Sequence, residues 1–499
     1  MVCSTRVGIL LFFSIVSVLV FSVNVRAQSS GLVLEGEQHW ETYGKGGTCI
    51  SGSHNLFIAD VDNDDVLEII TGGSLYNIVN GERTTSEAPL KIWNWIGNEI
   101  ILEKSHHWEG NIRCIYCEDL DGDNVMEIIT GGNVLGPAGI SSSIRIWNYD
   151  GENVVLKGSH EGFSVNSIFV SDLDKDGEKE ILTTSRSSYD VQSTAQLQIW
   201  KWDGDTLSLK GNVEWCASNG ARANSVYAYD LNKDNEIEII TVGYDNGLEN
   251  SSGQLRIWHW DGENLLLHIN QEWRTVEGCY GLTNAGGVMG NTLVENLKVG
   301  DVDGDGSVEI ITGGFTYDGE KINAQLRVWH FDEALSLEES HEWITEDITA
   351  VKVVSLNDVD DDGILDIVTG GLTSVYGSFK NAEATRDAAQ LRVFGWNGEA
   401  LTLKQKEDWT LADGVAVMNV GAGDLDNDGK HEIVSVGCMT LDALCDPDMR
   451  IWSIATEQTG FPYIYLAAVG AILAAILLGV FFLIRKRTYN STSNSIDKN

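Results

Sequence analysis

Proline and basic residues are scarce in this chain. Its 499 residues include 4 prolines, and 33 lysines and arginines stand against 74 aspartates and glutamates, which gives a formal net charge of −41. A surface this acidic repels the phosphates of nucleic acids, so neither DNA nor RNA is expected as a partner. Few prolines beside 53 glycines indicate many tight turns rather than long linkers.

The sequence also lacks the short motifs of several enzyme classes. It contains no nucleophile elbow, no HExxH motif, no phosphate-binding P-loop and no dinucleotide glycine fingerprint. We therefore expect a protein without catalytic activity. An enzyme whose site is a scattered set of lysine, arginine and tyrosine, as in polysaccharide lyases, stays open as an alternative.

The number of cysteines does not allow all of them to pair. Eight are present, and Cys3 falls in an N-terminal segment that we expect to be removed. The seven that are left imply at least one free thiol or an intermolecular bond in an exported protein. Cys438 and Cys445 flank a short loop and are the best candidates for a disulfide. Cys114 and Cys117 are three apart in a predicted strand and point to opposite faces, so we expect buried free thiols.

Both ends of the chain have the composition of membrane-targeting segments. Residues 1–27 combine Arg6 before a long apolar run with small residues at positions 25 and 27, which predicts a signal peptide cleaved after Ala27. An uncleaved anchor is the alternative. Residues 461–484 contain no charge and are long enough, as a helix, to cross a bilayer core of about 30 Å. Three basic residues follow, so 485–499 are expected in the cytoplasm and the bulk of the chain outside the cell.

One pattern recurs seven times between residues 31 and 454. An apolar segment leads into an acidic loop, as in NLFIADVDND at 55–64, and a second apolar segment ends in glycine, as in EIITGG at 68–73. A third segment carries tryptophans, as in LRIWHW at 255–260, and an Asp-Gly or Asn-Gly turn typical of β-hairpins often leads to a fourth. Each copy, about 61 residues long, therefore predicts four antiparallel strands. The tryptophans that recur at one position of the third segment are expected to fill the gaps between copies: Trp93, Trp147, Trp200, Trp258, Trp329 and Trp452.

The two ends of the repeat array predict how it closes. The third segment occurs seven times, whereas the fourth follows only six of them. The missing copy is at the other end, where residues 32–34 and Trp40 match it. An N-terminal strand that completes the last sheet would hide two exposed sheet edges. We therefore predict an all-β fold, a seven-bladed β-propeller over residues 31–454, with one C-terminal transmembrane helix over 461–484.

The acidic loops carry the most specific motif, Asp-x-Asp-x-Asp-Gly-x-x-Glu. One copy consists of Asp301, Asp303, Asp305, Gly306 and Glu309. Alternating carboxylates in a tight turn converge on one point and suit a hard cation that takes about six to eight oxygen ligands. Calcium fits better than magnesium, which prefers a strict octahedron with several waters, or zinc, which prefers nitrogen and sulfur. An acidic turn that only keeps a loop soluble is the alternative.

We expect up to seven calcium ions, one in each loop, held by positions one, three, five and nine of the motif. The expected metal ligands are Asp60, Asp62, Asp64 and Glu68; Asp119, Asp121, Asp123 and Glu127; Asp172, Asp174, Asp176 and Glu180; Asp230, Asn232, Asp234 and Glu238; Asp301, Asp303, Asp305 and Glu309; Asp358, Asp360, Asp362 and Asp366; and Asp424, Asp426, Asp428 and Glu432. At position six, Asp65, Asn124 and Asn235 replace glycine in three loops. Aspartate and asparagine tolerate a left-handed backbone better than other non-glycine residues. We expect weaker binding in the first loop and in the fourth, which also has Asn232 at position three.

These motifs and the strands around them resemble the FG-GAP or VCBS-type repeats of the integrin α-chain head and of related bacterial and archaeal surface proteins. The resemblance covers about residues 31–454. It implies that the acidic positions named above bind calcium in β-hairpin loops. It also implies a ligand-binding face at the opposite end of the propeller, formed by residues 76–89, 274–295, 314–324 and 371–389.

Together these features predict a calcium-binding module at the cell surface that acts in adhesion or ligand binding. Its expected partner is an extracellular protein or glycan, and it is expected to be held in the membrane by one C-terminal helix. Two alternatives stay open. One is an extracellular polysaccharide lyase or hydrolase, and the other is a scaffold subunit of a membrane complex that packs through the small residues Ala467, Ala471 and Ala475.

Overall fold

The computed structural model describes residues 31–39, 48–50, 55–79, 82–136, 139–162, 164–186, 193–216, 220–246, 251–274, 292–375, 387–411, 414–438, 447–455 and 485. The chain divides into two compact units, of which Leu32–Ile454 is one and Met1–Gly31 with Ala455–Asn499 is the other. The predicted signal peptide (1–27), the predicted transmembrane helix (461–484) and Cys445 lie outside the described residues. Within the described part of the chain, no helix is both long and apolar enough to span a membrane.

The unit Leu32–Ile454 is all-β, as predicted, and four of its sheets contain four antiparallel strands each. These sheets are β8 (Asn111–Glu118), β9 (Glu127–Gly136), β10 (Gly139–Tyr149) and β11 (Val154–Gly162); β12 (Ser164–Ser171), β13 (Glu180–Arg186), β14 (Ala195–Trp202) and β15 (Leu207–Trp215); β16 (Ala221–Tyr229), β17 (Glu238–Asn246), β18 (Ser251–Trp260) and β19 (Leu265–Trp273); and β28 (Ala416–Gly423), β29 (Glu432–Cys438) and β30 (Pro447–Ile454) with β1 (Leu32–His39). Short connections let each strand pair with the strand before it, which is the local pairing that the hairpin turns predict.

The two larger sheets contain the same four-strand arrangement with additional pairing. In the six-stranded sheet it is formed by β3 (Asn55–Ala59), β4 (Glu68–Gly72), β6 (Glu82–Ile96) and β7 (Glu99–Glu109), and the long β6 also pairs with β5 (Leu75–Val79), which pairs with β2 (Thr48–Ile50). In the eight-stranded sheet it occurs twice, as β20 (Thr292–Gly300), β21 (Glu309–Tyr317), β22 (Ile322–Asp332) and β23 (Ala334–Trp343), and as β24 (Ile348–Asn357), β25 (Asp366–Ser374), β26 (Ala388–Trp396) and β27 (Leu401–Trp409). A single parallel pair, Ile322 with Ile348, joins these two sets.

The first and last strands of this unit pair with each other. Strand β1 runs antiparallel to β30, with Leu32 opposite Ile454 and Leu34 opposite Trp452. This confirms that residues 32–34 supply the fourth strand of the sheet formed by β28, β29 and β30. The pairing joins two segments about 420 residues apart in the chain, so it also ties down the N-terminal edge.

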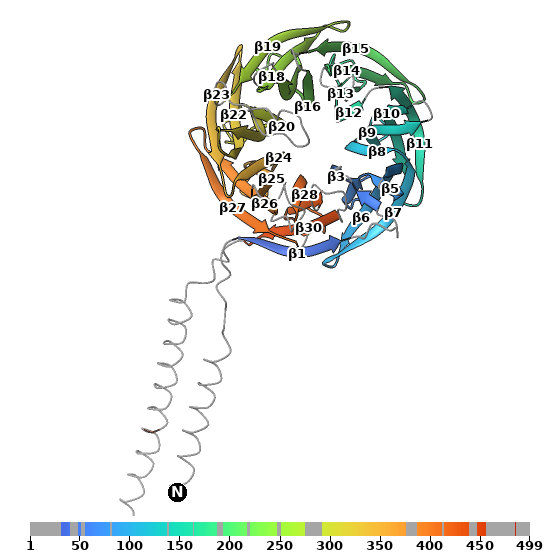
Figure 1. Cartoon of the computed structure of the whole chain (residues 1–499). Coiled ribbons are helices and arrows are strands. Elements are labelled where there is room, and N and C mark those ends of the chain that lie inside the picture. Colours follow the sequence, from blue (N-terminus) through green and yellow to red (C-terminus); the bar gives the residue numbers. More distant parts are fainter. Residues whose placement is uncertain are drawn as a thin grey trace, which may run out of the picture. The chain divides into compact units, whose positions relative to one another are not determined.

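The first strand of each four-strand set lies near a common centre, and the fourth lies at the periphery (Figure 1). Consecutive first strands contact one another, and β28 also contacts β3. Side chains on these strands hydrogen-bond to the backbone of the next: Asn55 Nδ2 to Ile112 O (3.4 Å), Asn166 Nδ2 to Ala223 O (2.9 Å), Asn224 Nδ2 to Val294 O (2.7 Å), Val354 N to Asn296 Oδ1 (3.2 Å) and Asn357 Nδ2 to Ala422 O (3.2 Å). These bonds add directional contacts to the apolar packing between neighbouring sets.

The recurring tryptophans of the third strands are buried, as predicted. Each donates its indole N–H to a hydroxyl on the neighbouring second strand: Trp93 to Thr71, Trp147 to Thr130, Trp200 to Thr183, Trp258 to Thr241, Trp329 to Thr312 and Trp452 to Ser435, at 2.8–3.0 Å. A second tryptophan from the fourth strand packs beside several of them, as Trp273 does on Trp329 with ring centroids 5.0 Å apart. Their rings join the clusters of buried side chains between adjacent sets, so these residues have a structural role.

Cys114 and Cys117 are buried free thiols, as predicted. They lie on opposite faces of β8 and belong to different clusters of buried side chains. Burial raises the pKa of the Cys114 thiol to about 12, so it stays protonated and unreactive at neutral pH.

Candidate metal centres in the acidic loops

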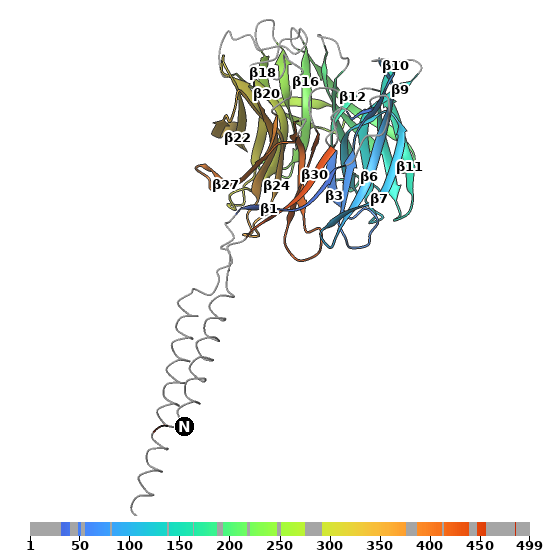
Figure 2. The same cartoon turned by 60° about the horizontal axis from the view of Figure 1, so that its bottom comes forward.

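Each acidic loop connects the first and second strands of a set. The strands run side by side between two ends of the unit (Figure 2). Because consecutive strands are antiparallel, the acidic loops share one end with the turns that connect the third and fourth strands. Two contacts show how close these turns come: a Cβ built on Gly151 would lie 3.1 Å from Asp62 Oδ2, and one on Gly398 would lie 3.0 Å from Asp303 Oδ2. The turn of one set therefore packs against the acidic loop of the set before it.

The same hydrogen bonds shape every loop. The aspartate at position one accepts the backbone N–H of position six, as in the 3.0 Å bond from Asp65 N to Asp60 Oδ2. The acid at position nine is buried at the start of the second strand and accepts the N–H of position two, as in the 2.9 Å bond from Val61 N to Glu68 Oε2. The position-nine bond recurs at Glu127, Glu180, Glu238, Glu309, Asp366 and Glu432, at 2.9–3.2 Å. These bonds hold the carboxylates of positions one and nine in fixed orientations.

The structure brings positions one, three and nine of the motif together. In each cluster, one carboxylate oxygen per residue lies within 4.8 Å of the others. These clusters include Asp60, Asp62 and Glu68; Asp119, Asp121 and Glu127; Asp172, Asp174 and Glu180; Asp301, Asp303 and Glu309; and Asp358, Asp360 and Asp366. Position five is used differently, because one of its oxygens accepts the N–H of position seven, as in the 2.9 Å bond from Val66 N to Asp64 Oδ1. We therefore expect three principal carboxylate ligands per loop. The second oxygen of position five is available as a further metal ligand.

The loops without glycine at position six keep the same backbone. Asp65, Asn124 and Asn235 adopt φ values of 68°, 68° and 73°, and Gly177 has 90° at the same position. The lost glycine therefore does not distort the first loop. In the fourth loop the missing charge matters more: Asn232 Nδ2 donates to Asp234 Oδ2 at 3.0 Å, which is an interaction within the loop that a carboxylate could not make.

Several carboxylate oxygens in these loops are buried without a hydrogen-bond partner among the described residues. They are Asp62 Oδ1, Glu127 Oε1, Asp172 Oδ1, Asp230 Oδ1, Asp360 Oδ1 and Asp366 Oδ1, of which the last forms an ion pair with Lys404. Buried polar atoms in folded proteins are nearly always satisfied, and an unpaired anionic oxygen is especially unfavourable. A bound cation would satisfy these atoms, so the residues present fit a calcium ion in number, charge and geometry.

Burial and mutual repulsion raise the pKa values of the position-nine acids. Desolvation is the largest cause, the nearby aspartates add to it, and the backbone N–H of position two opposes it. The pKa of Glu68 rises to about 8, and those of Glu127, Glu180, Glu309 and Glu432 rise to about 7. A divalent cation beside these groups would favour their charged forms.

The free energy of unfolding of the calcium-free chain is expected to fall as the pH rises from about 5 to about 8. The folded-state pKa of Glu68 is about 8 and that of Glu309 about 7, above the ordinary value of 4.5, so the folded chain binds these protons more tightly than the unfolded chain does. The resulting stability is present below pH 4.5 and is lost as the pH passes through the folded-state values. Thermal melts in EDTA over this range check the expectation. In calcium, which requires deprotonated ligands, the melting temperature should stay level or rise, and an equal fall in both conditions would contradict the metal assignment.

Among the described residues, lysine side chains form ion pairs with the motif carboxylates of the third and sixth loops. Lys404 Nζ on β27 lies 2.7 Å from Asp366 Oδ1, 2.9 Å from Asp360 Oδ2 and 3.3 Å from Asp362 Oδ2. Its ammonium therefore contacts positions three, five and nine of the sixth loop. Lys201 Nζ on β14 lies 3.1 Å from Asp176 Oδ2, 2.8 Å from Glu178 Oε2 and 3.6 Å from Glu180 Oε1. It forms no ion pair with Asp172 or Asp174 of the third loop.

The first loop receives the opposite charge. Glu103 on β7 occupies the strand position that Lys404 has on β27, one residue after the leucine that pairs with the third strand. Its charge contributes to raising the pKa of Asp62, after desolvation and Asp64. The additional negative charge of Glu103 favours calcium in the first loop. It therefore opposes the weaker calcium binding that we expected there from Asp65. The motif could not predict three charged residues beside the loops: Glu103, Lys201 and Lys404. They belong to other strands, and only the strand register places them at the loops.

Substituting Lys404→Met is expected to open the sixth loop to calcium. The substitution removes the ammonium that now neutralises Asp360 and Asp366 and keeps a side chain of similar length. Calorimetric titration of the calcium-depleted chain should show about one more ion bound per chain than in the unsubstituted protein. The matched control is Lys210→Met, a lysine exposed on β15. An unchanged stoichiometry in Lys404→Met would show that the ammonium does not compete with the metal.

The predicted recognition segments are only partly described. Residues 275–291 and 376–386 lie outside the described residues, as do the side chains of 76–79 and 82–86. The segment 314–324 is a hairpin between β21 and β22, in which Asp318 accepts the N–H groups of Glu320 and Lys321. Comparison with protein-family models and with curated proteins found no match to this chain.

Proposed function

We propose that the chain is a calcium-binding, seven-bladed β-propeller at the cell surface that binds an extracellular protein or glycan. The observation that carries the proposal is the repeated cluster of positions one, three and nine, in which buried carboxylate oxygens lack hydrogen-bond partners among the described residues. An acidic loop that served only for solubility would expose its carboxylates to water. In these loops the ninth acid is buried and the first is held by backbone N–H groups.

Closure of the propeller is supported at both ends of the repeat array. The four-strand sets number seven when the two larger sheets are divided into their parts. Contacts between β28 and β3 connect the last set to the first, and the pairing of β1 with β30 completes the last set. A ring of this kind leaves only short, protected sheet edges.

The location outside the cell is proposed from the composition of the chain's two ends. Residues 1–27 would direct export and 461–484 would anchor the chain in the membrane, with 485–499 in the cytoplasm. Sites with carboxylate ligands of this number suit the calcium concentrations found outside cells. Up to seven ions are proposed, and the sixth loop is the one in which Lys404 would compete with the metal.

Ligand binding by the propeller is proposed to occur without catalysis. A panel of extracellular glycans and proteins, presented to the full chain in detergent with calcium, tests this proposal. We expect at least one ligand to bind without turnover and its binding to weaken on removal of calcium. Cleavage of a polysaccharide would instead support the lyase or hydrolase alternative, and a stoichiometric membrane protein recovered with the chain would support the scaffold alternative.

A further inference from the structure

A cavity of about 420 Å³ lies among the first strands of the sets, around the common centre of the unit. Each first strand contributes one residue to its wall at an equivalent position. In every set this residue pairs with the second-strand residue that stands two positions after the ninth acid of the loop. These residues are Phe57, Tyr116, Phe169, Tyr227, Lys298, Ser355 and Gly421. Four consecutive aromatic residues therefore face one lysine and two small residues. This asymmetry is unlike the acidic loops, whose motif is nearly the same in each set.

The four aromatic rings form one continuous arc. The ring centroids of Phe57 and Tyr116 are 5.0 Å apart, those of Tyr116 and Phe169 are 5.4 Å apart, and those of Phe169 and Tyr227 are 4.2 Å apart. Lys298 continues the arc, with Nζ 5.9 Å from the centroid of Tyr227. On the rest of the wall, Ser355 has a small side chain, and Gly421 has none, with Ile58 and Leu56 of β3 packed against its backbone. The cavity thus offers an apolar wall on one side and room for a planar group beside it.

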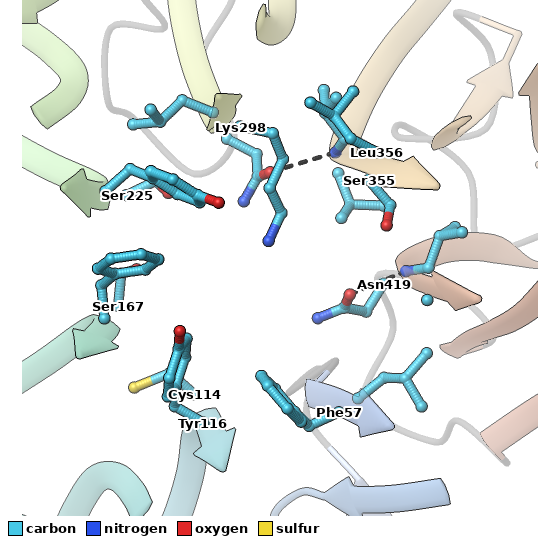
Figure 3. Close-up of a pocket in the computed structure, with 18 of the residues that line it drawn as sticks. Phe57, Cys114, Tyr116, Ser167, Ser225, Lys298, Ser355, Leu356 and Asn419 are labelled. Carbon is cyan, nitrogen blue, oxygen red and sulfur yellow. Dashed lines mark hydrogen bonds between the residues drawn. The ribbon is translucent and has the colours of Figure 1, made fainter. Parts of the chain in front are cut away.

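The ammonium of Lys298 points into this cavity (Figure 3). Desolvation lowers its pKa, and no carboxylate of the described residues forms an ion pair with it. The acid on its own strand, Glu295, is already engaged, because it pairs with Lys352 on β24 at 2.7 Å. A desolvated ammonium without a counter-charge is unfavourable, so Lys298 is poised to accept an anion from outside.

Two further hydrogen-bond donors face the same space. The hydroxyl of Tyr116 and the side-chain amide of Asn419 point toward the cavity (Figure 3). Asn419 Oδ1 accepts the N–H of Val420 at 2.8 Å, which fixes the amide so that its NH₂ group is left for a ligand. Lysine, tyrosine and asparagine side chains can all donate to a carboxylate.

We propose that this central cavity binds a small organic carboxylate with a planar apolar body. The carboxylate is held by Lys298, with Asn419 and Tyr116 as further donors, and the planar body packs on the arc of Phe57, Tyr116, Phe169 and Tyr227. This site is separate from the acidic loops and needs no bound calcium. In a chain of net charge −41, the surrounding acidic surface repels larger polyanions, so the cavity, in which Lys298 forms no ion pair with the described residues, favours a small anion.

Calorimetric titration of the full chain with benzoate, and with benzamide as its neutral counterpart, tests the proposal. Benzoate is expected to bind, and benzamide to bind at least about 10-fold more weakly, because only benzoate supplies the counter-charge. Lys298→Met should weaken benzoate binding by about 10-fold or more, whereas Lys298→Arg, which keeps the charge, should retain most of it. The control Lys210→Met makes the same change in net charge on the outer surface and should leave binding unchanged.

The stability of the variant provides a second readout. Removing an unpaired, desolvated charge is expected to raise the melting temperature of Lys298→Met, so loss of binding in this variant would not come from unfolding. Addition of EDTA should leave benzoate binding in place, which separates this site from the calcium loops. The proposal is overturned if benzoate does not bind at about 10 mM, if benzamide binds equally well, or if Lys298→Met binds benzoate as tightly as the unsubstituted chain.

Discussion

Removal of calcium with EGTA is expected to lower the melting temperature of the full chain by more than about 10 °C. Each occupied loop contributes about 2.7 kcal/mol when free calcium exceeds its dissociation constant about 100-fold, and less when calcium is nearer to that constant. Without the cation, the clustered acids of each loop repel one another beside a buried ninth acid. Differential scanning calorimetry before and after chelation measures the shift.

The controls separate a specific loss of calcium from a general effect of chelation. Excess calcium added after EGTA should restore the original melting temperature. Magnesium at the same concentration should restore less of it, because magnesium gives up its waters reluctantly and requires a stricter geometry. A melting temperature that EGTA leaves unchanged would contradict a structural role for the ions.

The second large effect is expected at the ninth position of the fifth loop. Glu309 is buried, accepts the backbone N–H of Val302 at 3.2 Å and belongs to the cluster with Asp301 and Asp303. In calcium, Glu309→Ala should lower the free energy of unfolding by about 3 kcal/mol, because it removes a metal ligand and leaves the Val302 N–H unpaired. Denaturant unfolding with calcium present measures this change.

The matched variant Glu309→Gln separates the two roles of this side chain. Its amide oxygen can still accept the N–H of Val302, but its charge is gone. In calcium, Glu309→Gln should destabilise the chain. In EDTA near pH 8 the sign should reverse, because the burial and repulsion that raise the pKa of Glu309 to about 7 no longer act on a charged group. A destabilisation of equal size in both conditions would mean that no cation acts on this residue.

The strands and the acidic loops could be predicted from the sequence because they depend on local signals. Alternation of apolar residues, the Asp-Gly and Asn-Gly turns and the spacing of the aspartates all act within about ten residues. The pairing of β1 with β30 was also predictable, because a fourth segment was missing at one end of the array and present at the other. The additional strands β2 and β5 had no comparable signal, since they do not recur in the other copies.

The charges that modify each loop could not be predicted from the motif. Lys404 and Glu103 occupy equivalent positions on the fourth strands of their sets, yet one brings a positive and the other a negative charge. Their effect depends on the strand register, which places a fourth-strand residue against a loop that precedes it by about 40 residues. Weaker binding in the first loop was expected from Asp65 alone, whereas Glu103 adds a carboxylate there.

The residues of the central cavity are misassigned when the first strands are read by alternation from their first residues. The first strands shift register by one residue near their beginnings, for example between Ile112 and Cys114 and between Val294 and Asn296. Each shift moves the following residues to the other face of the strand, so simple alternation from the strand start misassigns them. Counting back from the acidic loop avoids the shift, because Tyr116, Tyr227 and Lys298 each stand three positions before the first aspartate of their loops, and the strand pairing places them at one level.

The most direct test of the calcium assignment is the metal content of the purified full chain, measured by elemental mass spectrometry after dialysis against calcium-containing buffer and corrected for the calcium of the dialysate. The loop geometry and the ammonium of Lys404 in the sixth loop together predict about six calcium ions per chain, rising to about seven in Lys404→Met. A chain that contains no calcium beyond that of the dialysate would contradict the assignment.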